Sequence, residues 1–146
     1  MDSDEPTVIS AIMLSDHAIR EAGTNKITLI GIFSIWNSPG FPLRVPLFYI
    51  TPFITNFREG GEKAITIRIE NKDRHVLWSM GGKIGFAAGP VRNVAMVDAP
   101  IPVQGLTFME AGRYRIFVIV DGSEIGFRDF NVVPLTALPP SSPQLS

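Results

Sequence analysis

The stretch from Phe108 to Val133 constrains the fold more than any other part of the chain. Two apolar runs flank Asp121-Gly122, and an Asp-Gly pair between such runs favours a two-residue type I′ turn, because both central residues need positive φ. The stretch is therefore predicted to form a β-hairpin. Tyr114 and the alternate residues that follow it then share one face, since side chains in a strand repeat with a period of two.

An uninterrupted ladder leading away from that turn would pair unsuitable residues. Arg115 would lie opposite Arg128, and like charges directly opposite each other destabilise a sheet. One extra residue near Arg128-Asp129 would instead place Phe130 across from Tyr114 and bring Asp129 within reach of Arg115. The sequence thus predicts a β-bulge at Arg128-Asp129.

The composition limits the classes of protein to which this chain can belong. A chain of 146 residues with 45% hydrophobic and 18% charged residues is typical of a single globular domain. The net charge of −1 gives no electrostatic signature for nucleic acid or an anionic membrane surface. The absence of cysteine excludes disulfides, thiolate catalysis and cysteine-ligated metals.

The N-terminus and the apolar runs indicate a location. Residues 1–7, MDSDEPT, are acidic and lack the basic start and apolar core of a signal peptide. No apolar run reaches the roughly 18–20 residues that a membrane-spanning helix needs. We therefore expect a soluble, cytoplasmic protein of bacterial or phage origin, without a membrane partner.

The rest of the chain alternates apolar runs with glycine- and proline-rich turns. Residues 16–25 contain helix formers, and Asp16 could cap one or two helical turns there. Residues 26–36 are apolar on both faces, which predicts a central strand covered on each side. Pro52 cannot donate to a ladder, so it is expected at an edge or beside a bulge. The other predicted strands are 7–14, 47–56, 62–71, 75–80 and 91–97.

Eight or nine short strands with almost no helix predict an all-β protein. The expected architecture is a single antiparallel β-sandwich of the Ig-like or Greek-key type, and a small β-barrel is the alternative. The predicted divisions are an N-terminal extension at 1–6, the sandwich domain at 7–134 and a Pro/Ser-rich C-terminal tail at 135–146.

No motif assembles groups for catalysis or for binding a cofactor or metal. The chain lacks G-x-S-x-G and H-E-x-x-H, and its two histidines, His17 and His75, are isolated and predicted to be surface residues. Gly81-Gly82-Lys83-Ile84-Gly85 has glycines but neither the Ser/Thr nor the helix of a phosphate loop, so residues 81–90 are predicted to be a connecting loop. The protein is accordingly predicted to be no enzyme and to hold no cofactor.

The most aromatic, proline-punctuated segment is the predicted partner surface, because aromatic residues supply contact area at low entropic cost. The alternative is that Trp36 and Phe41 close the end of the core. The candidate partner-binding residues are Trp36, Pro39, Phe41, Pro42 and Phe48.

Over about residues 8–133, the chain resembles a family of small bacterial proteins of unknown function. Ser15 stands where that family usually has cysteine. The resemblance implies a single β-sandwich, without an assigned activity or catalytic residues. It is carried by Leu14-Ser15-Asp16-His17-Ala18, Lys26–Phe33, Phe41-Pro42, Phe108, Gly112–Ile116 and Val120-Asp121-Gly122.

Together these observations predict a non-enzymatic β-sandwich that works through protein–protein contacts, with a protein partner or self-association, as an accessory, scaffolding or assembly module. A second hypothesis is a small-ligand binder with a pocket between the sheets. A third is a hydrolase that uses a pair of carboxylates, which a cleft holding two acids, one of them in apolar surroundings, would favour.

Overall fold

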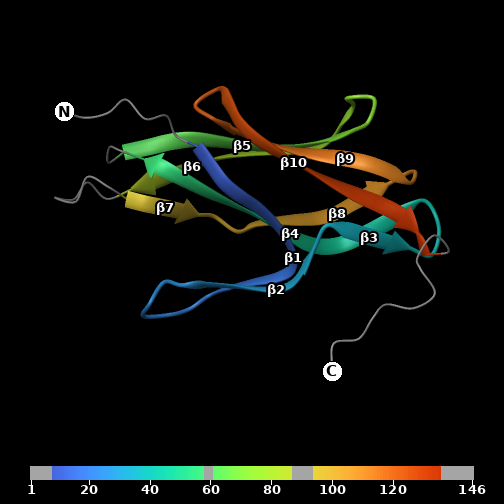
Figure 1. Cartoon of the computed structure of the whole chain (residues 1–146), viewed down its shortest axis with the longest axis horizontal. Coiled ribbons are helices and arrows are strands. Elements are labelled where there is room, and N and C mark those ends of the chain that lie inside the picture. The colour runs from blue at the N-terminus through green and yellow to red at the C-terminus, as the bar shows by residue number, and fades with distance from the viewer. Residues whose placement is uncertain (1–7, 58–60, 87–93, 136–146) are drawn as a thin grey trace.

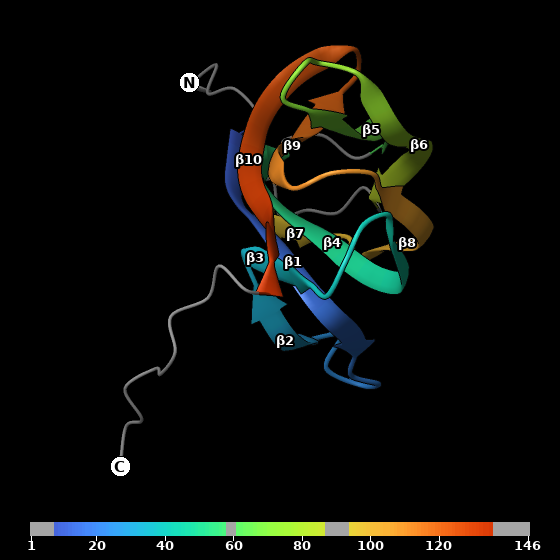
Figure 2. The same ribbon diagram turned by 90° about the vertical axis from the view of Figure 1, so that its right-hand side faces the viewer.

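The computed structural model describes residues 8–57, 61–86 and 94–135, and these form ten strands in two packed sheets (Figures 1 and 2). Neighbouring strands are antiparallel except β3 and β10, which are parallel. The first sheet has the order β2 (Ile27–Phe33), β1 (Val8–Arg20), β4 (Leu43–Phe57), with β7 (Val94–Asp98) and β8 (Ile101–Phe108) along the far edge of β4. The second has the order β3 (Ile35–Ser38), β10 (Ser123–Pro134), β9 (Gly112–Val120), β5 (Gly61–Asn71), β6 (Val76–Phe86).

The predicted all-β architecture of two layers is confirmed, with ten strands in the described ranges rather than eight or nine. Among the residues that the structure describes, no helix has the length and apolar character needed to cross a bilayer.

The core lies between the two sheets and follows the period of two expected for strands. In β5, Ile65, Ile67 and Ile69 are buried, as their alternation with polar residues predicts. At one end of the core three aromatic rings pack together, with ring centroids 4.9 to 5.9 Å apart; they belong to Phe108, Tyr114 and Phe130. This aromatic cluster therefore joins β8 of the first sheet to β9 and β10 of the second.

Tyr114 also fixes the corner at which the chain passes from the first sheet to the second. Its hydroxyl donates a hydrogen bond to the carbonyl of Glu110, 2.6 Å away, in the connection between β8 and β9. Burial raises the pKa of this hydroxyl above its usual value. The contact is similar to the tyrosine corner of Greek-key sandwiches, where a tyrosine hydroxyl bonds to the backbone a few residues upstream.

The β9–β10 hairpin has the predicted turn and the predicted end pairing. Asp121 and Gly122 have φ values of 49° and 81°, the positive values that a type I′ turn requires. Phe130 lies opposite Tyr114, as expected. The hairpin is thus read correctly from the sequence at both of its ends.

The position of the bulge in this hairpin is predicted wrongly. The ladder is regular through Arg128 and Asp129, and the register shifts instead between Glu124 and Gly126. The extra residue is Ile125, which packs against the core as a partly buried side chain. An early bulge gives the same pairing at Asp129, and therefore the charge argument alone could not distinguish the two positions.

Two predictions for the N-terminal third are also wrong. Residues 16–25 form no helical turn, because β1 continues through Arg20 and pairs with β2 to make a second hairpin. Residues 26–36 are not one central strand, because β2 is an edge strand and β3 belongs to the other sheet. Within β2, Gly31 has φ +71°, a backbone conformation that favours glycine, and the side chain of Asp16 lies against it.

Two further predictions concern glycine and proline residues, which often interrupt strands. The predicted loop at 81–90 is wrong in its first part, because Gly81 to Phe86 continue β6, and residues 87–90 lie outside the described ranges. Pro52 sits in the middle of β4 opposite Ile12. Its other side faces the break between β7 and β8, since the ladder stops at Asp98 and resumes at Ile101. A proline is tolerated there because that side has no strand to receive a hydrogen bond.

Candidate functional site

Two strands that face each other across the open side of the sandwich are each unpaired along half their length. β2 pairs with β1 only from Leu14 to Arg20, so residues 8–13 of β1 have β4 on one side and no described strand on the other. β3 pairs with β10 only from Asn131 to Pro134, so residues 123–130 of β10 have β9 alone. Each unpaired edge carries backbone groups that a sheet would otherwise satisfy.

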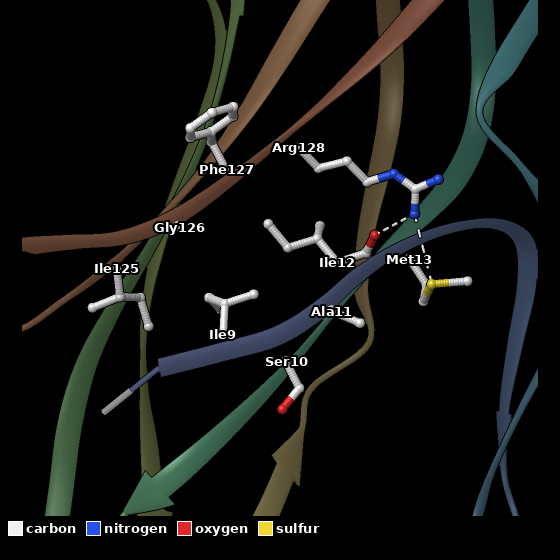
Figure 3. A pocket seen from close by; sticks show the side chains of 9 residues that line it. All are labelled: Ile9, Ser10, Ala11, Ile12, Met13, Ile125, Gly126, Phe127 and Arg128. Carbon is white, nitrogen blue, oxygen red and sulfur yellow. Dashed lines mark hydrogen bonds between the residues drawn. The ribbon is translucent and has the colours of Figure 1, made fainter. Parts of the chain in front are cut away.

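A groove of about 520 Å³ runs between these two edges (Figure 3). It is lined by five consecutive residues of β1, Ile9 to Met13, and by four of β10, Ile125 to Arg128. Most of these side chains are apolar, and the exceptions are the hydroxyl of Ser10 and the guanidinium of Arg128. The site therefore combines an apolar wall with free strand edges and one cation.

At one end of the groove, Gly126 lets the two edges approach closely. A Cβ atom at this position would lie 2.9 Å from Cγ1 of Ile9 and 3.0 Å from its Cβ. No other residue type fits there without displacing β10 or β1. The bulge at Ile125 places the glycine at this point of contact, since it shifts the register of β10 by one residue just before Gly126.

At the other end, Arg128 connects the sheets. Its Nη1 donates a hydrogen bond to the carbonyl oxygen of Ile12 and also lies 3.6 Å from Sδ of Met13 (Figure 3). This bond satisfies one acceptor on the free edge of β1. A guanidinium carries five N–H donors, so Arg128 can hold this carbonyl and still donate to a bound group.

The five predicted partner-binding residues lie elsewhere, around the short β3 and the start of β4. Phe48 is fully buried and belongs to the core. Trp36 is partly buried, with its ring 5.5 Å from that of Phe48. Phe41 also packs partly against the core, and only Pro39 and Pro42 are exposed. The structure thus brings Trp36 and Phe48 together and packs Phe41 against the core, and partner binding by this segment stays a prediction.

The histidines and the glycine-rich segment do not come together into one site. His17 is exposed on β1 of the first sheet, and His75 is exposed before β6 of the second. Within the described ranges, no group of three or more histidines and carboxylates is arranged to hold a metal ion. The described residues of the glycine-rich segment, up to Phe86, lie in β6 rather than in a phosphate-binding loop.

Comparison with known protein families identifies the family of this chain. A model of a family of unknown function, DUF6941, matches residues 10–133. The chain belongs to this family. The match spans both edges of the groove, from Ser10 on β1 to Arg128 on β10, and it agrees with the resemblance drawn from the sequence motifs.

Comparison with other proteins adds little. No curated protein matches the chain. Among solved structures, it is similar to the Pseudomonas fluorescens alkylpurine DNA glycosylase AlkC bound to DNA containing an abasic site analog, with a TM-score of 0.47 and 10% identity. The match covers 87% of this chain but 30% of the glycosylase chain, so the chain spans less than a third of that enzyme. A likeness at this level says nothing about activity.

Sequence reasoning missed the groove because its edges come from opposite ends of the chain. One local signal was present: Gly126 interrupts the apolar alternation of the C-terminal hairpin, and an isolated glycine in a strand marks a bulge or a close approach of another backbone. Ile9 gave no comparable signal, because any apolar residue in a first strand has the same pattern.

Proposed function

We propose that the protein is a non-enzymatic, cytoplasmic binding module that takes up an extended segment of a partner protein in the groove between β1 and β10. The observation that carries the proposal is the pair of facing strand edges, residues 8–13 and 123–130, that no described strand covers. An accessory or scaffolding role follows from such a surface, which offers binding groups and no convergent catalytic set.

Unpaired strand edges are a recognised site for extended peptides. The peptide adds main-chain hydrogen bonds to the edge, and pockets beside the edge select its alternate side chains. The groove supplies both elements, because the partly buried Ile9 and Ile125 give it an apolar wall and Phe127 is 52% exposed beside it. Arg128 stands at one end and offers donors to the peptide backbone or to a carboxylate.

The other two hypotheses have less support in the described residues. Glycines can leave room for an internal pocket, but the side chain of Asp16 fills the space at Gly31, and Gly82 faces open space outside the core. A hydrolase would need a carboxylate in apolar surroundings. The buried acid Glu70 instead pairs with an arginine, Arg68, at 2.6 Å. Both hypotheses remain predictions without an observation that favours them.

The proposal can be tested with a displayed library of random peptides about ten residues long, selected on the immobilised full chain. Ser10→Trp would fill the groove, because Ser10 lines it and is exposed. Ser79→Trp is the matched control, since Ser79 is also exposed but lies on β6. We expect selected peptides to bind the wild type and the control equally, and to bind Ser10→Trp at least about tenfold more weakly.

Thermal melting of both variants would establish that they fold. Peptides that bind Ser10→Trp as well as they bind the wild type would contradict the groove. If the same peptides lost affinity for Phe41→Ala instead, the partner surface would lie at the segment around Trp36 and Phe41. Failure to select any peptide, together with a strictly monomeric state by light scattering, would remove the proposal.

A further inference from the structure

The outer face of the second sheet, away from the core, carries two rows of side chains that cross β5, β9 and β10. Register places Phe117 beside Arg68 and Phe127 in the first row. The second row consists of Glu70, Arg115 and Asp129, in the same strand order. An outer sheet face is usually covered by scattered polar residues, whereas here arginines, phenylalanines and acids are in contact.

The two phenylalanines are covered by cations. The guanidinium carbon of Arg115 lies 4.0 Å from the ring centroid of Phe127, and that of Arg68 lies 5.0 Å from that of Phe117. The rings are themselves 6.2 Å apart. These contacts leave Phe117 only 5% exposed although it points away from the core. Arginine on an aromatic ring combines attraction with a fixed orientation of its donors.

The acids of the second row are occupied by arginines. Arg115 donates to both oxygens of Asp129, at 2.6 and 3.1 Å, and this pairing lowers the pKa of the Asp129 carboxyl and raises that of Arg115. Glu70 accepts from Arg68 at 2.6 Å, and Arg74 approaches it at 3.9 Å. The carboxylates of this row are therefore already neutralised from within the sheet.

Beside these rows is a pocket of about 290 Å³ in which cations outnumber acids. Among the described residues that line it, four are cationic and two, Glu70 and Glu124, are acidic. Two of the cations, Lys72 and Arg113, are exposed and have no ion-pair partner among the described residues. The four cations are Lys72, Arg74, Arg113 and Arg115. A local excess of positive charge on a protein whose net charge is −1 is a feature of this pocket rather than of the whole surface.

We infer that this pocket is a second binding site, which takes an acidic segment of a partner protein by placing carboxylates against Lys72 and Arg113. The strands on its floor, β5 and β9, are paired on both sides, so recognition uses side chains rather than a backbone edge. Charge complementarity supplies the attraction, and Phe127, which is 52% exposed, supplies contact area.

The lining favours an acidic peptide over nucleic acid. Glu124 stands among the cations, and it would repel a continuous row of phosphates but can lie between the spaced carboxylates of a peptide. The ring of Phe127 has Arg115 over one face, which removes that face as a platform for stacking a base.

The test uses the full chain and a fluorescein-labelled peptide of alternating glutamate and glycine, measured by anisotropy at low and at physiological salt. Lys72→Glu and Arg113→Glu should each weaken binding about three- to tenfold, because each reverses a charge that faces the ligand. Lys26→Glu is the matched control, since Lys26 is exposed on the connection between β1 and β2, and it should change the affinity less than twofold. Raising the salt should weaken binding to the wild type.

Ser10→Trp separates this site from the proposed groove, because Ser10 lines the groove and not the pocket. Loss of the selected peptides with unchanged binding of the acidic peptide would confirm two independent sites. Equal losses in Lys72→Glu and Lys26→Glu would overturn the inference, since the effect would then follow net charge alone. Binding of a single-stranded oligothymidylate in place of the acidic peptide would overturn it as well.

Discussion

The β9–β10 and β1–β2 hairpins are both rich in apolar residues, yet they have opposite relations to the core. In β9, Ile116 and Val118 are fully buried between the sheets. In β2, Ile30 is 45% and Ile32 is 53% exposed, and Figure 1 shows this strand on the side of the molecule away from β9 and β10. The difference teaches that an apolar strand is buried only where a second sheet faces it, which the strand's own sequence does not specify.

The two hairpins also reach their shapes by different means. In β9–β10 the positive φ angles lie in the turn, at Asp121 and Gly122, and at Gly112, where β9 begins. In β1–β2 a positive φ lies in the middle of a strand, at Gly31, and the side chain of Asp16 lies against that residue. The backbone therefore requires glycine at the turn of one hairpin and inside a strand of the other.

The largest expected effect contrasts one apolar residue from each region. Phe130→Ala should destabilise the protein by about 3–5 kcal/mol, because it leaves a cavity beside Phe108 and Tyr114 in the core. Ile32→Ala should cost less than about 0.5 kcal/mol, because that side chain is already half in solvent. Urea denaturation gives both values. Similar losses in the two variants would mean that the β1–β2 hairpin has a buried face in solution.

An intermediate effect on stability is expected at Gly31 of β2. Gly31→Ala should destabilise the protein by about 1–2 kcal/mol, because alanine pays for positive φ and its Cβ would meet the carboxylate of Asp16. Gly40→Ala is the control, since Gly40 has no positive φ and nothing lies within 4 Å of an added Cβ. Adding Asp16→Ala to Gly31→Ala should restore only the part of the stability that is lost through contact between the new Cβ and Asp16. Full recovery would show that the backbone of β2 is unstrained.

The smallest effect concerns the ion pair on the outer face of β9–β10. The pKa of Asp129 is lowered in the folded state, so the pair contributes stability above the unfolded value of about 3.9, and that contribution is lost as the pH falls through the folded value. Asp129→Asn should therefore lower the urea midpoint slightly at pH 7 and leave it nearly unchanged at pH 2. An equal difference at both pH values would contradict a role for the charge.

The features that could be predicted are those encoded within one hairpin or one strand. The alternation of Ile65, Ile67 and Ile69 and the Asp121-Gly122 turn depend on residues next to each other in sequence, and both were correct. The candidate groove could not be predicted, because it exists where β2 and β3 stop pairing with longer neighbours. Local patterns identify strands, but they do not say where a partner strand ends.

The misplaced bulge and the charged pocket have the same origin. The sequence requires an extra residue somewhere between Gly122 and Asp129, and the bulge lies next to Gly126, which packs against Ile9 of the other sheet. The rows on the outer face likewise depend on the register between β5 and β9, which lie far apart in the chain. Long-range register, rather than residue type, was the missing information.

The close approach of Gly126 to Ile9 has a consequence for the width of the groove between the two sheets. The two edges can lie this close because residue 126 has no Cβ. An alanine at this position would push the edges apart and widen the groove. The residue that governs this width presents no side chain to an occupant. The width of the groove can thus change without any change in the side chains that contact a bound peptide.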